Sequence, residues 1–196
     1  VQKWGYGSWH YIHAKRGEVR KFLYRMGAGG ERYACNHSFY GYYRRFCAAY
    51  WDNRLAGARN EQERTAILEE KKKVFEADRP EFFARGYTGV PPQMCYTDPG
   101  FIAQVVQDAR DYFDGKGTKP GAVAAGDYFA LVPMDNGSYC TCPRCTAAQA
   151  NPVNTLDTFS NGRHSNYIFA FCSQVAQEVA RTHPDKILAT LAYASY

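Results

Sequence analysis

Two stretches of the chain repeat apolar residues at the spacing of an amphipathic helix. Asp98 is a good N-cap for a helix over residues 98–115, and Gly115 a good stop. Residues 165–182 show the same periodicity up to His183-Pro184, which predicts a second helix. The apolar stripe of the first helix consists of Phe101, Ile102, Val105, Val106, Ala109, Tyr112 and Phe113.

Shorter apolar runs separate the helical stretches. Residues 128–134 (YFALVPM) are too short for a helix and are typical of a strand buried on both faces. Residues 186–193 (KILATLAY) predict the next strand. The other expected elements are a weak strand at 32–37, an aromatic helix around 39–51, a charged helix around 61–77 and a weak strand at 92–96.

Strands that alternate with helices predict the α/β class with a parallel sheet, either an open doubly wound sheet or a (β/α) barrel. About four β/α units fit into this length, whereas a closed eight-unit barrel usually needs about 250 residues. We therefore expect residues 1–196 to form one segment of a larger protein. An open sheet would remove this mismatch in length.

A polar or reactive residue follows each predicted strand. Since parallel α/β folds bind ligands at the carboxyl ends of their strands, these residues are the first candidates for a site. They are His37, Tyr96, Asp98, Asp135, Asn136 and Tyr193.

The composition narrows the choice of ligand. Aromatic residues make up 16% of the chain, which suits a cleft that stacks sugar rings, although an aromatic core with surface tyrosines explains the same figure. The net charge of +5 is scattered along the chain, so nucleic-acid binding gets little support. No apolar run approaches the roughly 18 residues that cross a bilayer, and we expect no membrane association.

The seven cysteines cannot all pair within one chain. Cys47 and Cys172 lie in apolar helical patterns and are expected as buried thiols. The spacing Cys140-x-Cys142-x-x-Cys145 lets several sulfurs converge on one tetrahedral ion such as zinc, in a closed structural site. A disulfide or reduced thiols would explain the same spacing. The fourth ligand is expected from Cys95, at the end of the preceding predicted strand, or otherwise from His37 or His164.

Asp135 is the candidate for proton chemistry. A carboxyl group at a strand end in an aromatic cleft can act as a general acid, and the cysteines that follow would hold its loop in place. The sequence Asp-Asn-Gly is also typical of a simple turn. Glycosidases usually need a second carboxylate. Asp98 and Asp127 are the candidates for it, but Asp98 is better explained as a helix cap.

Side chains that could orient a sugar accompany this acid. His37 is followed by several tyrosines and arginines, a mixture that could stack on a sugar and pair with a carboxylate on it. A packed or capping role for His37 is an equal alternative. The expected substrate-binding residues are Asn136, His37, Tyr40, Tyr96 and Asp127.

Three segments, NHSFYGYYRRF, PPQMCYTDPGFIAQVVQDARDYFDGKG and GDYFALVPMDNGSYCTCPRC, resemble a bacterial family of large, mostly secreted proteins. The family is catalogued as a domain of unknown function and grouped with α-glucuronidases and β-hexosaminidases. The resemblance implies a (β/α)8 catalytic barrel of the glycosidase type, with residues 1–196 covering about half of it, the central strands, and with Asp135 after the fourth strand. It also implies a secreted or periplasmic location and places a cysteine at Cys95 and a histidine at His37. Asn136 departs from the Glu or Asp-Glu acid that is frequent in such glycosidases.

We therefore expect a glycoside hydrolase acting on a polysaccharide or oligosaccharide, with uronic-acid-containing substrates among the candidates. Asp135 would protonate the leaving oxygen, and Cys95, Cys140, Cys142 and Cys145 would form a structural zinc site. No organic cofactor is expected. The alternative is a non-catalytic carbohydrate-binding or interaction module that carries the same zinc site.

Overall fold

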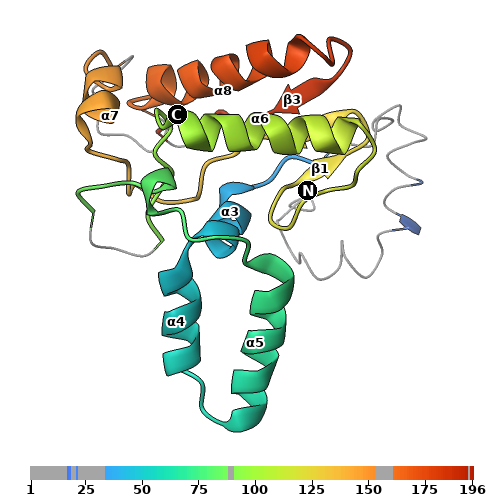
Figure 1. Ribbon diagram of the computed structural model, residues 1–196. Helices are drawn as coiled ribbons and strands as arrows, with labels where there is room; N and C mark the ends of the chain where they lie inside the picture. The colour runs from blue at the N-terminus through green and yellow to red at the C-terminus, as the bar shows by residue number, and fades with distance from the viewer. Residues whose placement is uncertain (1–16, 19–20, 22–33, 88–90, 153–160, 194) are drawn as a thin grey trace, which may run out of the picture. The chain divides into compact units, whose positions relative to one another are not determined.

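The computed structural model describes residues 17–18, 21, 34–87, 91–152, 161–193 and 195–196. The chain divides into two compact units, Val1–Arg32 and Tyr33–Tyr196. All helices and strands below belong to the second unit (Figure 1).

Both amphipathic helices that the sequence predicts are confirmed. Helix α6 covers Pro99–Phe113, and the Asp98 side chain caps it by accepting a hydrogen bond from the Phe101 N–H at 3.0 Å. Helix α8 covers Ser165–Ala180 and packs along α6 (Figure 1). The rings of Phe101 and Phe171 stack between them with centroids 5.5 Å apart, so the two apolar stripes face each other.

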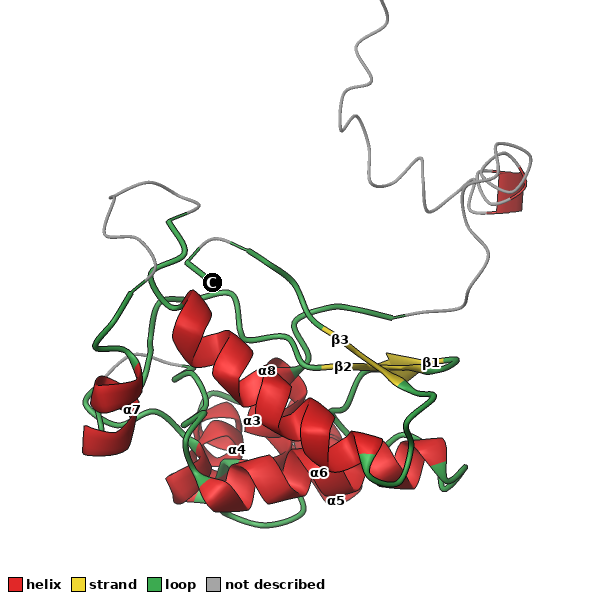
Figure 2. Cartoon of the chain, turned by 90° about the horizontal axis from the view of Figure 1, so that it is seen from above, coloured by secondary structure: helices red, strands yellow, loops and turns green. Residues whose placement is uncertain are grey.

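A small mixed sheet lies next to these helices. Strands β1 (Ala124–Ala125), β2 (Tyr128–Ala130) and β3 (Ile187–Ala189) lie side by side in this order (Figure 2). Strand β1 is antiparallel to β2, whereas β2 and β3 are parallel. Since α8 connects β2 to β3, these elements form a βαβ unit, and the mixed helix and sheet content is compatible with the α/β class.

The two stronger strand predictions are confirmed over shorter lengths than expected. Strand β2 ends at Ala130, yet the chain stays buried through Met134, as the apolar run predicts. Strand β3 ends at Ala189. A last backbone hydrogen bond joins Leu131 N–H to the Ala189 carbonyl at 2.8 Å, and the two segments then continue into the loops that carry Asp135 and Tyr193.

The two weak strand predictions are wrong over the described residues. Residues 34–37 form no strand because the neighbouring Ser38 hydroxyl, instead of a backbone ladder, bonds to the Ala130 carbonyl and the Val132 N–H at 3.1 and 3.0 Å. Residues 92–96 contribute one antiparallel bridge, Met94 to Phe83. The N–H groups of Gln93, Cys95 and Tyr96 bond to a loop, to the end of the 3-10 helix and to a tyrosine hydroxyl of the last long helix, so residues 92–96 form a connection and not a strand. Residues 32 and 33 lie outside the described residues.

The remaining helices begin and end where their local geometry requires. The aromatic helix predicted around 39–51 is interrupted at Cys47, whose backbone is extended, and becomes α3 (Phe39–Phe46) and α4 (Ala48–Ala56). Helix α5 (Glu61–Val74) begins at Asn60, which accepts a hydrogen bond from the Glu63 N–H. The 3-10 helix η1 (Pro80–Phe82) and helix α7 (Pro143–Ala148) complete the unit. Among the described helices, none is long and apolar enough to span a membrane.

Much of the aromatic content lies in the core. Phe39 is fully buried and meets the rings of Tyr42, Tyr96, Phe101 and Phe171 at 5.3 to 5.8 Å. These separations are those of favourable ring pairs. The core therefore explains many of the aromatic residues that the composition suggested for a sugar cleft.

Candidate functional site

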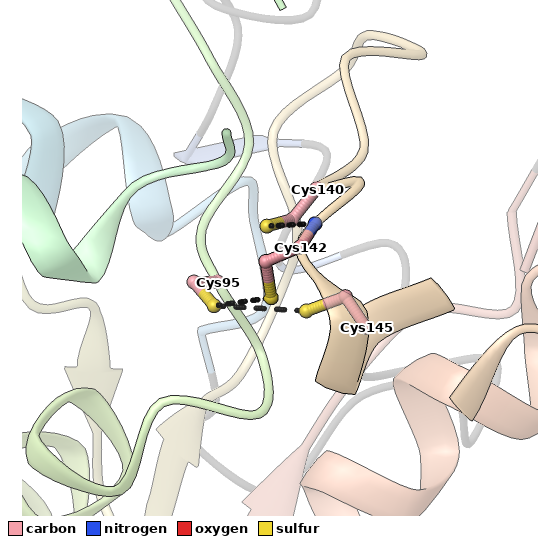
Figure 3. A group of neighbouring side chains, drawn as sticks. All are labelled: Cys95, Cys140, Cys142 and Cys145. Carbon is pink, nitrogen blue, oxygen red and sulfur yellow. Dashed lines mark hydrogen bonds between the residues drawn. The ribbon is translucent and has the colours of Figure 1, made fainter. Parts of the chain in front are cut away.

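Four cysteine sulfurs converge beside the helices α6 and α7. Cys95 lies in the loop before α6, Cys140 and Cys142 follow the β2 segment, and Cys145 lies in α7 (Figure 3). The four Sγ atoms lie within 4.8 Å of one another, and all four residues are buried. The Sγ atom of Cys95 is 3.8 Å from that of Cys142 and 3.6 Å from that of Cys145. The structure thus brings together the four predicted ligands, and they could hold a metal ion.

The spacing of the sulfurs fits a tetrahedral metal centre. Zinc–sulfur bonds of about 2.3 Å imply sulfur–sulfur distances of about 3.8 Å in a regular tetrahedron. The separations of Cys95 Sγ from the sulfurs of Cys145 and Cys142, 3.6 and 3.8 Å, agree with this value. A disulfide would bring two sulfurs to about 2.05 Å. The cysteines of the cluster are free, so the disulfide alternative is not the arrangement in this structure.

Hydrogen bonds around the cluster favour the ionised sulfurs that metals bind. Cys140 Sγ accepts from the backbone N–H groups of Arg85 and Cys142 at 3.3 and 3.5 Å. The Tyr167 hydroxyl donates to Cys145 Sγ at 2.9 Å, and the Thr97 hydroxyl lies 3.0 Å from the same sulfur. These partners support the sulfurs of Cys140 and Cys145, as ordered neighbouring groups do in metal sites.

A hydrogen bond between two thiols of the cluster shifts their pKa values in opposite directions. The hydrogen bond from Cys95 lowers the pKa of Cys145, and the hydroxyls of Thr97 and Tyr167 act in the same direction. The same bond to Cys145, together with burial, raises the pKa of Cys95. Because the thiolate is the metal-binding form, the hydrogen bonds at Cys145 favour the state of this sulfur that binds a metal ion. Four protein ligands leave no open position, which is typical of a structural centre.

The loop that carries Asp135 lies between strand β2 and the cluster. The Asp135 N–H donates to the Tyr40 hydroxyl at 3.1 Å, and the carboxylate Oδ2 lies 4.0 Å from His37 Nε2. The Asp135 side chain is 55% exposed. It faces a hollow of about 200 Å³. The hollow is lined by Met134, Asp135, Asn136, Gly137, Tyr139, Tyr193, Ser195 and Tyr196.

His37 is oriented by the segment that precedes Asp135. Its Nδ1 lies 2.6 Å from the Pro133 carbonyl oxygen, and since a carbonyl only accepts, Nδ1 carries the proton of this bond. In the neutral ring, Nε2 is then the unprotonated nitrogen, and it is this atom that is nearest to Asp135. The rings of Tyr40 and Tyr193 meet His37 edge-on at 6.3 and 5.7 Å. Loops from three parts of the chain therefore meet at Asp135.

Other predicted site residues have structural partners. The Asn136 side chain bonds within its neighbourhood, to the Pro91 carbonyl and the Ser138 N–H. Tyr96 is 2% exposed and belongs to the aromatic core, with its hydroxyl donating to Gln93 Oε1. Asp127 precedes β2 and pairs with Lys186 at 2.8 Å, so it lies at the opposite end of the strand from Asp135.

The two histidines considered as substitute ligands are placed elsewhere. His37 belongs to the Asp135 hollow, and the His164 ring lies against Tyr139 with centroids 3.9 Å apart. Burial lowers the pKa of His164. Within the described part of the chain, the group of possible metal ligands contains Cys95 in place of either histidine.

Sequence reasoning missed Gln93, a polar residue that is fully buried between the cluster and the Asp135 loop. Its amide donates to the carbonyls of Met134 and Asn136 at 2.6 and 2.9 Å. A polar side chain directly before the apolar pair Met94-Cys95 was the one signal of it in the sequence. Tyr196, which lines the hollow, was missed as well, because only the fold brings it next to Asp135.

The fold and the site define a mixed helix and sheet protein with a buried four-cysteine candidate metal centre next to an acidic loop. The chain belongs to the family described as Domain of unknown function (DUF4838), whose model matches residues 19–196. This finding confirms the resemblance to a family of unknown function. No curated protein matches the chain, and no solved structure does.

Proposed function

We propose that this protein is a glycoside hydrolase in which Asp135 is the general acid. The observation that carries the proposal is the meeting of Asp135, His37 and a tyrosine-lined hollow just beyond the paired β2 and β3 segments. Ligands of parallel α/β folds bind at this end of the strands. A carboxyl group that can protonate the leaving oxygen is one of the two acidic groups that glycosidic bond cleavage usually requires.

In the proposed reaction, the Asp135 carboxyl group gives its proton to the oxygen of the departing sugar. His37 Nε2, 4.0 Å away, would orient the carboxyl group, and Tyr40 holds its backbone. The second carboxylate is neither Asp98, which caps α6, nor Asp127, which pairs with Lys186. A different carboxylate, or an acyl group of the substrate itself, would stabilise the positive charge at the sugar carbon.

The proposal also covers the fold of the whole protein, its enzyme group and its substrate. The parallel βαβ unit of β2, α8 and β3 would be a repeat of a (β/α) catalytic barrel, completed by the remainder of a larger protein. We assign this protein to the glycosidases allied to α-glucuronidases and β-hexosaminidases, in a bacterial, secreted or periplasmic setting. The substrate would be a polysaccharide or oligosaccharide, with uronic-acid-containing chains among the candidates.

Zinc is the metal that we propose for the four-cysteine centre. The sulfurs present the tetrahedral set of soft ligands that zinc prefers, and all four are buried. When bound, zinc would supply structural cross-linking rather than chemistry on the substrate. Cys95, Cys140, Cys142 and Cys145 would hold it.

The test is hydrolysis of a panel of aryl glycosides and aryl uronides by the full-length protein. Asp135→Asn should lower kcat/KM by about 10²- to 10⁴-fold, the usual contribution of a general acid, with unchanged folding. Asp127→Asn is the matched control, because it removes the same charge at the other end of the strand. Equal turnover by Asp135→Asn and the wild type would exclude Asp135 as the acid. Sugar binding without aryl release would favour the carbohydrate-binding module instead.

A further inference from the structure

Gln93 is hydrogen-bonded to the Asp135 loop through both ends of its side-chain amide. Its Nε2 donates to the carbonyl oxygens of Met134 and Asn136, the two residues that flank Asp135, at 2.6 and 2.9 Å. Its Oε1 accepts from the Met134 N–H at 3.2 Å. The residue is fully buried. A buried amide with these partners holds the backbone on either side of the acid at a set distance.

The backbone of Gln93 extends this attachment. Its N–H donates to the Ser138 carbonyl at 3.2 Å, and its carbonyl accepts from the Ala84 N–H at 2.8 Å. The loop is thus bonded to Gln93 at Met134, Asn136 and Ser138. The Gln93 side chain reaches the backbone on both sides of Asp135, whereas the Tyr40 hydroxyl accepts from the N–H of Asp135 itself.

Gln93 is also next to the four-cysteine centre along the chain. Cys95 lies two residues after Gln93, and Cys140 lies two residues after Ser138. Cys95 and Cys140 both belong to the four-cysteine cluster. The cluster, Gln93 and the loop from 134 to 140 therefore form a closed ring of covalent and hydrogen-bonded links.

We propose that Gln93 is a positioning residue that transmits the geometry of the four-cysteine centre to Asp135. The role of Asp135 in this statement rests on the proposed function, whereas the link from the centre to the loop does not. A metal bound by the four sulfurs holds Cys95 against Cys142 and Cys145. Gln93 then holds the backbone at Met134 and Asn136, and this sets where the Asp135 carboxyl group points.

The chemistry of an amide is what this position needs. Met134 and Asn136 present carbonyl oxygens that require donors, and the Met134 N–H and the Tyr96 hydroxyl require an acceptor. A glutamate lacks the donors, and an apolar side chain lacks both. Either change leaves buried polar groups unpaired, which is costly.

The experiment compares Gln93→Met with Gln149→Met in the zinc-loaded full-length protein. Gln149 is the matched control because its Nε2 bonds to the carbonyls of Cys140 and Cys145, at the cluster but away from Asp135. Hydrogen exchange is followed at the Met134 amide and in helices α6 and α8, and zinc content is measured in parallel. Gln93→Glu, which keeps the acceptor and the size, serves as the second variant.

Gln93→Met should speed exchange at Met134 by roughly ten- to a hundredfold, as expected for the loss of a buried hydrogen bond. Zinc content, α6, α8 and the Gln149→Met control should stay unchanged. Chelating zinc from the wild type should speed the same amide, and should add little in Gln93→Met. Unchanged exchange at Met134 would overturn the proposal, since Gln93 would then not hold the loop. Equally faster exchange throughout α6 and α8 would also overturn it, since Gln93 would then stabilise the whole fold.

The activity measurement separates this proposal from the proposed function. With an active wild type, Gln93→Met should lower kcat by up to about 100-fold and leave KM nearly unchanged, because a misplacement of about 1 Å suffices for such a loss. An inactive wild type with the expected exchange pattern would refute the hydrolase and leave the link intact. An active protein whose kcat is insensitive to Gln93→Met and Gln93→Glu would refute positioning.

Discussion

Replacing Cys145 by serine tests the metal centre most directly. Cys145 Sγ lies 3.6 Å from Cys95 Sγ and has hydroxyl partners in Tyr167 and Thr97. Serine keeps the size and the hydrogen bonding of the side chain but removes a thiolate ligand. We expect about one zinc per chain in the wild type and loss of tight zinc binding in Cys145→Ser.

The expected change in Tm on zinc removal follows from the free energy of zinc binding. The sulfurs of Cys142 and Cys145 stand within a few tenths of an ångström of the separation from Cys95 Sγ that zinc requires, so these two pairs need little rearrangement to bind it. At free zinc about a thousandfold above Kd, binding stabilises the fold by about 4 kcal/mol. Since 1 kcal/mol shifts Tm by about 2–4 °C in a unit of this size, zinc removal should lower Tm by about 8–16 °C.

The assay combines elemental analysis, cobalt(II) substitution and thermal unfolding with and without a chelator. Thiolate ligation should give cobalt charge-transfer absorption in the wild type and a weakened band in Cys145→Ser. Cys47→Ser is the control, because Cys47 lies between α3 and α4 and outside the cluster. Stoichiometric zinc retained by Cys145→Ser, or an equal loss from Cys47→Ser, would refute the four-sulfur centre.

Two further predictions concern the core. Asp108→Ala should cost about 3–5 kcal/mol in urea unfolding because it removes the buried partner of the Arg45 guanidinium and leaves only the half-exposed Glu76 to pair with it. Glu63→Ala, which removes a partly exposed i,i+4 pair with Arg59, should cost little, and equal losses would contradict this. Burial raises the pKa of Cys172 to about 11. The unfolded thiol ionises first, so stability should fall by about 3 kcal/mol between pH 8.5 and 11. Cys172→Ala should flatten this slope, and an unchanged slope would refute it.

The two long helices could be predicted because their signals are local. Asp98 caps α6 with a hydrogen bond three residues away, and the apolar stripes of α6 and α8 follow directly from the helical repeat. The cysteine cluster could be predicted from the sequence for a related reason. Its three cysteines lie within six positions, and the expected order of strands pointed to Cys95 as the fourth ligand.

The weak strands show where local signals fail. Short apolar runs around 34–37 and 92–96 resemble strands, but whether they form strands depends on hydrogen-bonding partners that lie far away in the sequence. At Ser38, a side-chain hydroxyl takes the place of a backbone ladder. The backbone N–H of Gln93 bonds to the Ser138 carbonyl in a loop, and that of Cys95 bonds to the Phe82 carbonyl at the end of η1.

By itself, the sequence determined helices α6 and α8, the buried run after Asp127 and the three closely spaced cysteines of the cluster, since each depends on spacing along the chain. Tertiary structure decided the neighbours of Asp135. His37, Gln93 and Tyr196 reach its loop from about 100, 40 and 60 residues away in sequence. Which side chains meet at that distance depends on how whole elements pack, because the free energy of packing is shared by the entire core.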